Sequence, residues 1–275
     1  MNEHELALRL GLPAETIRAL EALPFPAEEE ARLKPLFRQD PAAFEAEGAR
    51  LENGLCILKL YLRWLPEVLS AYRARSIPEE IFWDSCQDFG IWCRDALNRN
   101  GVPGLAEWSW IGMTMRLELF RLGRLQFEPS RLSHDIRIGG AFYPAGTPHL
   151  EVHIPAEAPL DPDAVQSALS QAVSFFERYF GTRYALFHCH SWLLAPELRE
   201  ILPEHARILQ FQSLFTVYAH GSERQAEDRV FGRLSDDPAD YPRDTSLRRS
   251  MRLYLMAGHS VGVGMGVRPI PCDSL

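Results

Sequence analysis

The chain has 275 residues, a net charge of −8, 46% apolar residues and 24% charged residues. These are the proportions of a globular protein with enough apolar material for one large domain or two smaller ones. The acidic balance and the lack of any basic run speak against a nucleic-acid partner, which would need a basic patch. No window approaches the roughly 20 apolar residues that cross a bilayer, so we expect no membrane partner.

The first hundred residues have the apolar spacing of successive helices. Leucines recur at helical intervals over residues 49–73, where Pro66 is expected to introduce a kink. Residues 78–98 have a proline and two glutamates in the first turn and Gly101 just beyond the end, which are typical helix boundaries. The sequence therefore predicts a helical N-terminal domain over residues 1–104.

Beyond residue 104 the pattern changes, and apolar and polar residues alternate as they do in strands. Asp161 and Pro162 have the features of a helix start, and Gly181 those of a helix end. These signals predict a strand–helix–strand core in a mixed α/β domain over residues 105–275. The expected strands cover residues 117–127, 149–154, 184–190, 207–219 and 230–234, with a helix over 246–256 and a last strand reaching Gly266.

The cysteines are odd in number, scattered and free of any CxxC pair. This pattern argues against a disulfide framework and against a structural zinc cluster, and it suits a reducing compartment. The N-terminus has no apolar core of signal-peptide length, so we expect a cytoplasmic protein. The five cysteines are Cys56, Cys86, Cys93, Cys189 and Cys272.

Two polar pairs stand at strand spacing, Glu151 with His153 and His188 with His190. Residues two apart in a strand share one face, so neighbouring strands could gather one carboxylate and up to three imidazoles. Such a set could bind zinc, or could hold a general base and its partner. It could also be a set of ordinary polar side chains at strand ends.

Further candidates flank these pairs. Ser191 and Trp192 follow the predicted strand at the end where ligands meet open α/β sheets. Arg124, Gln126 and Glu128 form a polar row of one parity that either lines the same cleft or faces solvent. Cys189 has the opposite parity to its histidine neighbours, which favours a core position over a nucleophile.

The glycines Gly262, Gly264 and Gly266 have the spacing of a nucleotide-binding loop. Such a loop needs a following helix, whose free N–H groups and dipole bind phosphate. Only nine residues follow Gly266, and two of them are proline. We therefore expect a glycine-bearing strand that presents a flat surface to a neighbour or a ligand.

Several segments over roughly residues 50 to 270 occur in an order that resembles a known bacterial family. Its members join a helical N-terminal domain to a GNAT-like C-terminal domain and are regarded as acyltransferases. The matching segments are Asp84 to Trp92, Gly104 and Leu105 before Trp110, Leu122 to Glu128, Leu150 to Pro155, Ser191 to Pro196, and Thr245 to Leu247 ahead of Gly258.

The resemblance implies an α+β protein with a largely antiparallel central sheet, and transfer of an acyl group from acyl-CoA to a small-molecule amine. It implies that residues 150–155 accompany the thioester and that residues 163–180 form the helix that receives the pyrophosphate. Under this hypothesis no metal is expected. The implied catalytic residues are Glu151 and His153 as candidate bases with His190 or Ser191 assisting; Gln126, Glu128 and Trp192 would bind substrate, and Ile154, Ala156 and Leu160 would bind the cofactor.

The stretch from Pro155 to Asp163 departs from the GNAT pattern, because it has no glycine and carries three carboxylates. Carboxylates at a helix N-terminus repel a pyrophosphate that would bind there. Two alternatives therefore stay open. One is a metal-dependent hydrolase that uses Glu151, His153, His188 and His190, and the other is a non-catalytic binding protein that has a GNAT-like cleft.

Overall fold

The computed structural model describes residues 1–24, 27–51 and 54–271, and the chain divides into two compact units, Met1–Phe120 and Arg121–Leu275. The sequence placed this boundary at residue 104, before the last helix of the N-terminal unit. Helix α8 (Trp108–Met115) packs on α5 (Leu55–Ala74) and α7 (Asp88–Asn100), which keeps it in the helical unit. The shift from a helical to a strand-like pattern occurs only after this helix ends. Cys272 lies outside the described residues.

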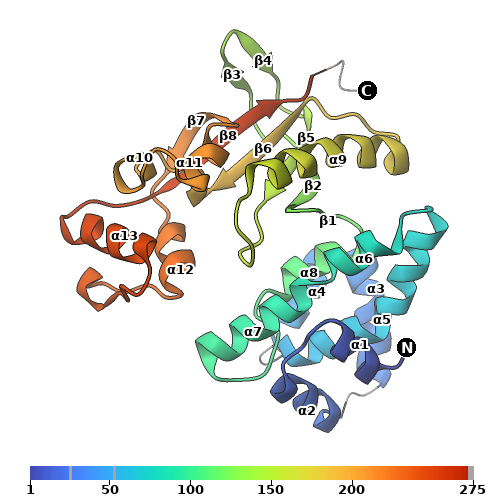
Figure 1. Cartoon of the computed structure of the whole chain (residues 1–275). Helices are drawn as coiled ribbons and strands as arrows, with labels where there is room; N and C mark the ends of the chain where they lie inside the picture. The colour runs from blue at the N-terminus through green and yellow to red at the C-terminus, as the bar shows by residue number, and fades with distance from the viewer. Residues whose placement is uncertain (25–26, 52–53, 272–275) are drawn as a thin grey trace. The chain divides into compact units, whose positions relative to one another are not determined.

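The first unit is helical, as predicted. Its core surrounds α5, where aromatic rings of α3 and α4 pack against Tyr61 and Trp64. The remaining helices cover this core (Figure 1). The helices before α8 are α1 (Glu3–Arg9), α2 (Ala14–Ala22), α3 (Ala27–Gln39), α4 (Pro41–Gly48), α5 (Leu55–Ala74), α6 (Glu79–Ser85) and α7 (Asp88–Asn100).

One detail of the helical unit differs from the sequence-based expectation. The helix expected over residues 78–98 is two helices, α6 and α7, separated at Cys86 and Gln87. Pro66 lies inside α5, which continues beyond it as far as Ala74. Apolar residues recur at helical spacing on both sides of Cys86 and Gln87, so periodicity alone did not reveal the break between α6 and α7.

The second unit is built on a six-stranded sheet in the order β1-β2-β5-β6-β8-β7. The neighbours β5 and β6 run parallel, whereas β2 with β5, β6 with β8 and β7 with β8 are antiparallel. This is the expected largely antiparallel sheet. Its strands are β1 (Phe120–Leu122), β2 (Leu125–Arg131), β5 (Pro148–His153), β6 (Leu186–Ser191), β7 (Thr216–Gly221) and β8 (Val263–Pro269).

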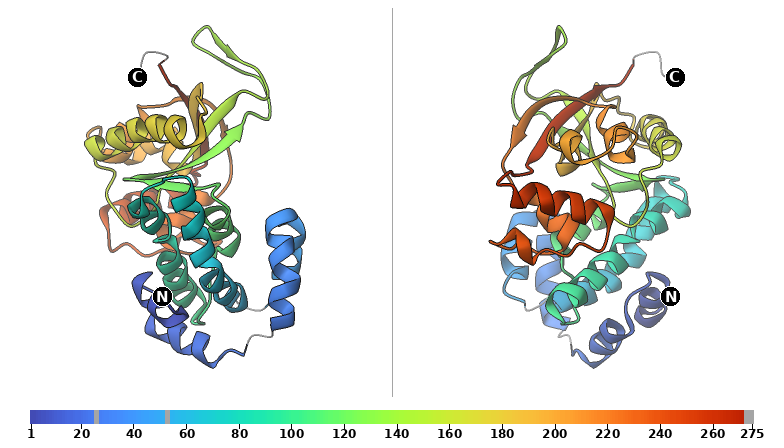
Figure 2. Two further views of the ribbon diagram at one scale, coloured as in Figure 1. Left: turned by 90° about the vertical axis from the view of Figure 1, so that its right-hand side faces the viewer. Right: turned by 60° about the vertical axis from the view of Figure 1, so that its left-hand side comes forward.

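Helix α9 (Pro162–Phe180) joins β5 to β6 and lies on one face of the sheet (Figures 1 and 2). The Asp161 carboxylate accepts the Ala164 N–H at 3.2 Å, Pro162 occupies the first position, and Gly181 ends the helix with φ of 62°. These are the predicted caps. The buried apolar residues of α9 face the apolar sheet residues that alternate with Gln126 and Glu128. The sheet face under α9 therefore forms the core of this unit.

The segment after β6 contains more helix than the sequence predicted. Residues 207–219 form α11 (Arg207–Gln212) followed by β7, and residues 230–234 belong partly to α12 (Gln225–Phe231) and not to a strand. Short apolar runs are equally compatible with helix and strand, and their packing decides between them. The other elements here are η2 (Trp192–Leu194), α10 (Leu198–Ile201), η3 (Pro238–Asp240) and α13 (Ser246–Met256).

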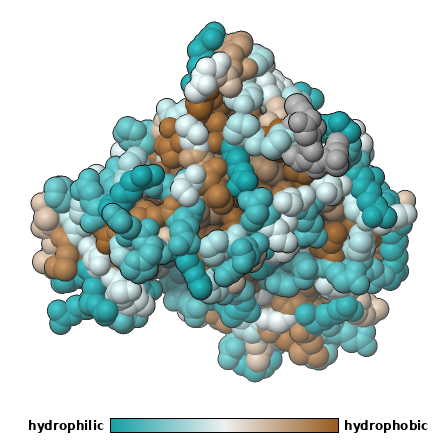
Figure 3. Space-filling view, turned by 45° about the horizontal axis from the view of Figure 1, so that its top comes forward, coloured by the Kyte–Doolittle hydropathy of each residue, from teal (hydrophilic) through white to brown (hydrophobic). Residues whose placement is uncertain are grey.

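A two-stranded hairpin of β3 (Ile136–Ile138) and β4 (Ala141–Tyr143) extends beyond the main sheet (Figure 2). Leu132, Ile136, Leu186 and Val267 form a small buried cluster against which Tyr218 packs. In the space-filling view of Figure 3, apolar side chains are exposed among hydrophilic ones. Among the described residues, no helix combines the length and the apolar character needed to traverse a bilayer.

Candidate functional site

The strands β5 and β6 separate within the sheet. Their parallel pairing ends at Glu151 opposite His188. Beyond this point β5 stays paired with β2 as far as His153, and β6 stays paired with β8 as far as Ser191. The two strands therefore diverge from each other while each keeps its other neighbour. The polar pairs predicted from the sequence lie on either side of this opening.

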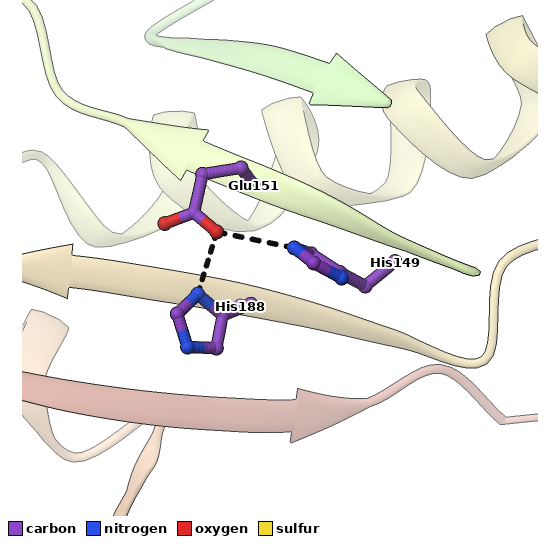
Figure 4. A group of neighbouring side chains, drawn as sticks. All are labelled: His149, Glu151 and His188. Carbon is purple, nitrogen blue, oxygen red and sulfur yellow. Dashed lines mark hydrogen bonds and ion pairs between the residues drawn. The ribbon is translucent and has the colours of Figure 1, made fainter. Parts of the chain in front are cut away.

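Glu151 occupies the point where the strands part, on the face of the sheet away from α9 (Figure 4). Its Oε2 atom lies 2.5 Å from Nδ1 of His188 and 3.2 Å from Nε2 of His149. Its Oε1 atom accepts the main-chain N–H of His190 at 3.1 Å. The carboxylate thus takes up an N–H group that the diverging β5 backbone no longer reaches. His149 has the same parity as Glu151, and the sequence reasoning overlooked it.

The environment of Glu151 favours its ionised form. Burial acts to raise the pKa of this carboxyl, but hydrogen bonds from His149 and His188, together with the charges of His188 and His153, hold the pKa well below its usual range. A carboxylate of such low basicity, with both oxygens already accepting bonds, is a poor proton acceptor. It is well suited to orient imidazoles and to stabilise positive charge on them.

A phenol extends this network. The Tyr218 hydroxyl lies 2.9 Å from Nε2 of His188, so hydroxyl, imidazole and carboxylate form a continuous chain. Tyr218 belongs to β7, which is separated from β6 by β8, and an irregularity between Val217 and Ala219 directs its side chain across. Burial and the Glu151 charge raise the pKa of Tyr218, so the phenol keeps its proton at neutral pH. The sequence pattern did not identify this residue.

His153 forms a second imidazole–carboxylate pair at the opening. Its Nε2 atom lies 3.1 Å from Oε2 of Glu128 on β2, and both side chains are about a quarter exposed. Gln126 stands opposite His153 in the β2–β5 register and is buried. The structure thus places His153, predicted as a base, beside Gln126 and Glu128, which were predicted to bind substrate. His153 is more accessible than either imidazole bonded to Glu151.

The remaining candidates after β6 have clear structural contacts. His190 is exposed, and its Nε2 atom lies 3.2 Å from Glu223. The Ser191 hydroxyl is buried and accepts the Leu193 N–H at 3.2 Å, which caps the turn of η2. Trp192 packs against the apolar cluster of the C-terminal helices. Ser191 and Trp192 therefore fix the end of β6.

The candidate cofactor-binding residues lie on the connection from β5 to α9. Ile154 is half-buried, Ala156 is exposed and Leu160 is buried.

Cys189 is buried on the other face of β6, in the core position that the sequence predicted. Burial raises the pKa of its thiol.

The geometry for a metal differs from the set that the sequence suggested. Among the described residues, ligand atoms of His149, Glu151 and His188 lie within 4.8 Å of one another. His153 and His190 stand apart from this group in their own pairs with Glu128 and Glu223. The four residues of the hydrolase alternative are therefore not gathered around one point.

The helical unit contains a separate pocket of about 300 Å³ between α3, α5 and the end of α8. Its cations Lys34 and Arg38 share the Glu67 carboxylate, and Arg116 pairs with Glu118 at 2.9 Å. None of the candidate catalytic or substrate-binding residues lines it.

Comparisons with known proteins agree with this architecture. Residues 119–268 match the family model of the GNAT-like C-terminal domain, and residues 1–117 match that of the N-acyltransferase N-terminal domain. The two models meet next to the boundary between the compact units. A search of the curated proteins gave no match.

Solved structures with the same fold are acyltransferases. One, an acyltransferase in complex with decanoyl-CoA and teicoplanin, aligns with a TM-score of 0.80 at 24% identity over 98% of this chain and 88% of its own. Another, in complex with decanoyl-CoA, aligns with a TM-score of 0.79 at 25% identity over the same shares. A mutant acyltransferase in complex with octanoyl-CoA aligns with a TM-score of 0.79 at 24% identity, again over the same shares.

Proposed function

Because this chain belongs to the family that joins an N-acyltransferase N-terminal domain to a GNAT-like C-terminal domain, we propose that it transfers an acyl group from acyl-CoA to an amine. The observation that carries the proposal is the row of imidazoles and carboxylates placed where β5 and β6 part. A thioester lying in this opening would have a base on β5 and an acid on the far side of β6.

In the proposed reaction His153, oriented by Glu128, takes a proton from the acceptor amine. The amine nitrogen attacks the thioester carbon, a C–N bond forms, and the C–S bond breaks. The Tyr218 phenol donates its proton to the departing thiolate of coenzyme A, and the His188–Glu151 pair supports the phenol. Glu151 therefore acts through His188 and not as the base itself, because its pKa is depressed.

The acceptor and the cellular location are part of the same proposal. Teicoplanin in a structural relative supports a bulky amine of the glycopeptide type as one acceptor to test. Among the described residues, Cys86, Cys93 and Cys189 are buried free thiols. Free thiols of this kind support a reducing cytoplasmic location.

Calorimetric titration with coenzyme A, octanoyl-CoA and decanoyl-CoA tests the proposed donor. We expect saturable binding with Kd in the micromolar range, and release of free thiol once an accepted amine is added. Protein purified without a metal-affinity tag should show the same turnover after treatment with a chelator. Absence of heat with all three compounds at about 1 mM would overturn the acyl-CoA assignment.

Substitution of Tyr218 by phenylalanine tests the acid. We expect kcat to fall about 10- to 100-fold while KM for both substrates stays within about three-fold, because only the proton donor is lost. Tyr143→Phe is the matched control, since Tyr143 packs against the same apolar cluster as Tyr218. Thermal unfolding of both variants should match the wild type. An unchanged kcat in Tyr218→Phe would remove the phenol from the reaction.

A further inference from the structure

The loop between β5 and α9 has an unusual composition for a loop that is expected to bind the diphosphate of coenzyme A. Residues 154–161 contain no glycine, and Glu157 and Asp161 add negative charge. The Asp161 carboxylate also takes an N–H group of the first turn of α9. The loop therefore lacks the glycine turns, the positive charge and part of the free helix N-terminus that would bind a diphosphate. If this loop binds the diphosphate, other residues of the fold must fix its conformation and supply the positive charge.

Arg124 reaches this loop from the neighbouring hairpin. It follows Gly123, whose φ of 61° makes the turn between β1 and β2. Its Nε donates to the Pro159 carbonyl at 2.9 Å and its Nη2 to the Ala158 carbonyl at 2.6 Å. The side chain is only 8% exposed. Two parallel bonds from one planar guanidinium fix two consecutive peptide groups, as an ammonium group could not.

The guanidinium of Arg124 is bonded to main-chain carbonyls and, among the described residues, to no carboxylate. Its Nη1 is buried without a hydrogen-bond partner in that part of the chain. Burial and the nearby Arg121 lower its pKa, although an arginine stays protonated at neutral pH. A buried cation of this kind directs its field onto the loop that it holds.

We propose that Arg124 is the positioning residue of the acyl-CoA site, holding the loop before α9 in the shape that receives the diphosphate of the donor. It replaces, from an adjacent hairpin, both the glycine turns and the positive charge that the loop lacks. The proposal rests on the proposed acyl-CoA function and adds to it a residue outside the loop itself.

Substitution of Arg124 by lysine and by alanine tests this role. Lysine keeps the charge and loses the two-carbonyl contact, and alanine loses both. With decanoyl-CoA as donor we expect KM to rise about 10-fold in Arg124→Lys and more in Arg124→Ala, with kcat within about three-fold. With decanoyl-pantetheine, which has no diphosphate, KM should stay within about two-fold of the wild type in both variants.

Arg131→Lys is the matched control, because Arg131 donates to the Gly146 carbonyl at 2.9 Å at the other end of β2. Its kinetic constants should match the wild type. Equal KM values for wild type and both Arg124 variants would overturn the inference, and so would equal rises with the two donors. A wild type that binds no acyl-CoA would instead overturn the proposed function, so the two failures are distinguishable.

Discussion

Replacing His153 with glutamine is expected to lower kcat for acyl transfer by about 10²- to 10⁴-fold. Glutamine keeps a polar group at the position facing Glu128, which lies 3.1 Å from the imidazole, but it cannot accept a proton from the amine. The affinity for decanoyl-CoA should be unchanged, because donor binding does not require proton transfer to residue 153. Steady-state release of thiol and calorimetric titration measure the two quantities on the same preparation.

Two further histidine variants make this result specific. His205→Gln changes an exposed histidine between α10 and α11, whose main-chain carbonyl accepts the Gln210 amide, so its kcat should stay at the wild-type value. His190→Gln tests the rival base on β6, which pairs with Glu223. A large loss in His190→Gln together with an active His153→Gln would transfer the role of base to His190.

The pH dependence separates the imidazole from the buried carboxylate. The pKa of Glu151 lies well below its usual value, so this group stays ionised throughout the range from about pH 5 to 8. Glu151 therefore cannot produce a loss of activity as the pH falls through that range. A loss of activity with falling pH inside that range must therefore come from a group other than Glu151, and the His153→Gln variant shows whether that group is the proposed base.

The sequence was most informative where local chemistry determines structure. Asp161, Pro162 and Gly181 marked both ends of α9, since caps act on the backbone within a few residues of themselves. Strand alternation placed Glu151 and His153 on one face for the same reason. His149 begins the same predicted strand and has the same parity, so this alternation also places it on the face of Glu151 and His153.

The rest of the site depends on pairing between distant strands. Glu128 faces His153 only because β2 and β5 have one particular register. Tyr218 reaches His188 only because of the sheet order and the irregularity in β7. Neither a register nor a bulge leaves a signal in a single sequence. Short apolar runs likewise carry no local signal that separates helix from strand, and residues 230–231, expected in a strand, end α12.

The glycines of β8 are expected to produce the largest effect on stability. A Cβ atom on Gly264 would lie 2.3 Å from the Leu194 carbonyl oxygen and 2.6 Å from its carbon. These are backbone atoms of a fully buried residue in η2, so they cannot move aside as a flexible side chain would. We expect Gly264→Ala to reduce the free energy of unfolding by about 3 kcal/mol or more, measured by urea denaturation.

Gly266→Ala provides the graded comparison. Its Cβ would meet the Leu194 Cδ1 and Phe215 Cβ atoms at 3.0 Å. The Leu194 methyl group ends a flexible side chain and can move aside, so the expected loss is about 1 kcal/mol. Equal stability of Gly264→Ala and wild type would show that η2 does not lie against β8. The absence of Cβ atoms at Gly264 and Gly266 thus allows η2 to pack closely on β8. Because η2 directly follows Ser191, this packing also fixes the end of β6. The end of β6 forms one side of the opening that holds the proposed site.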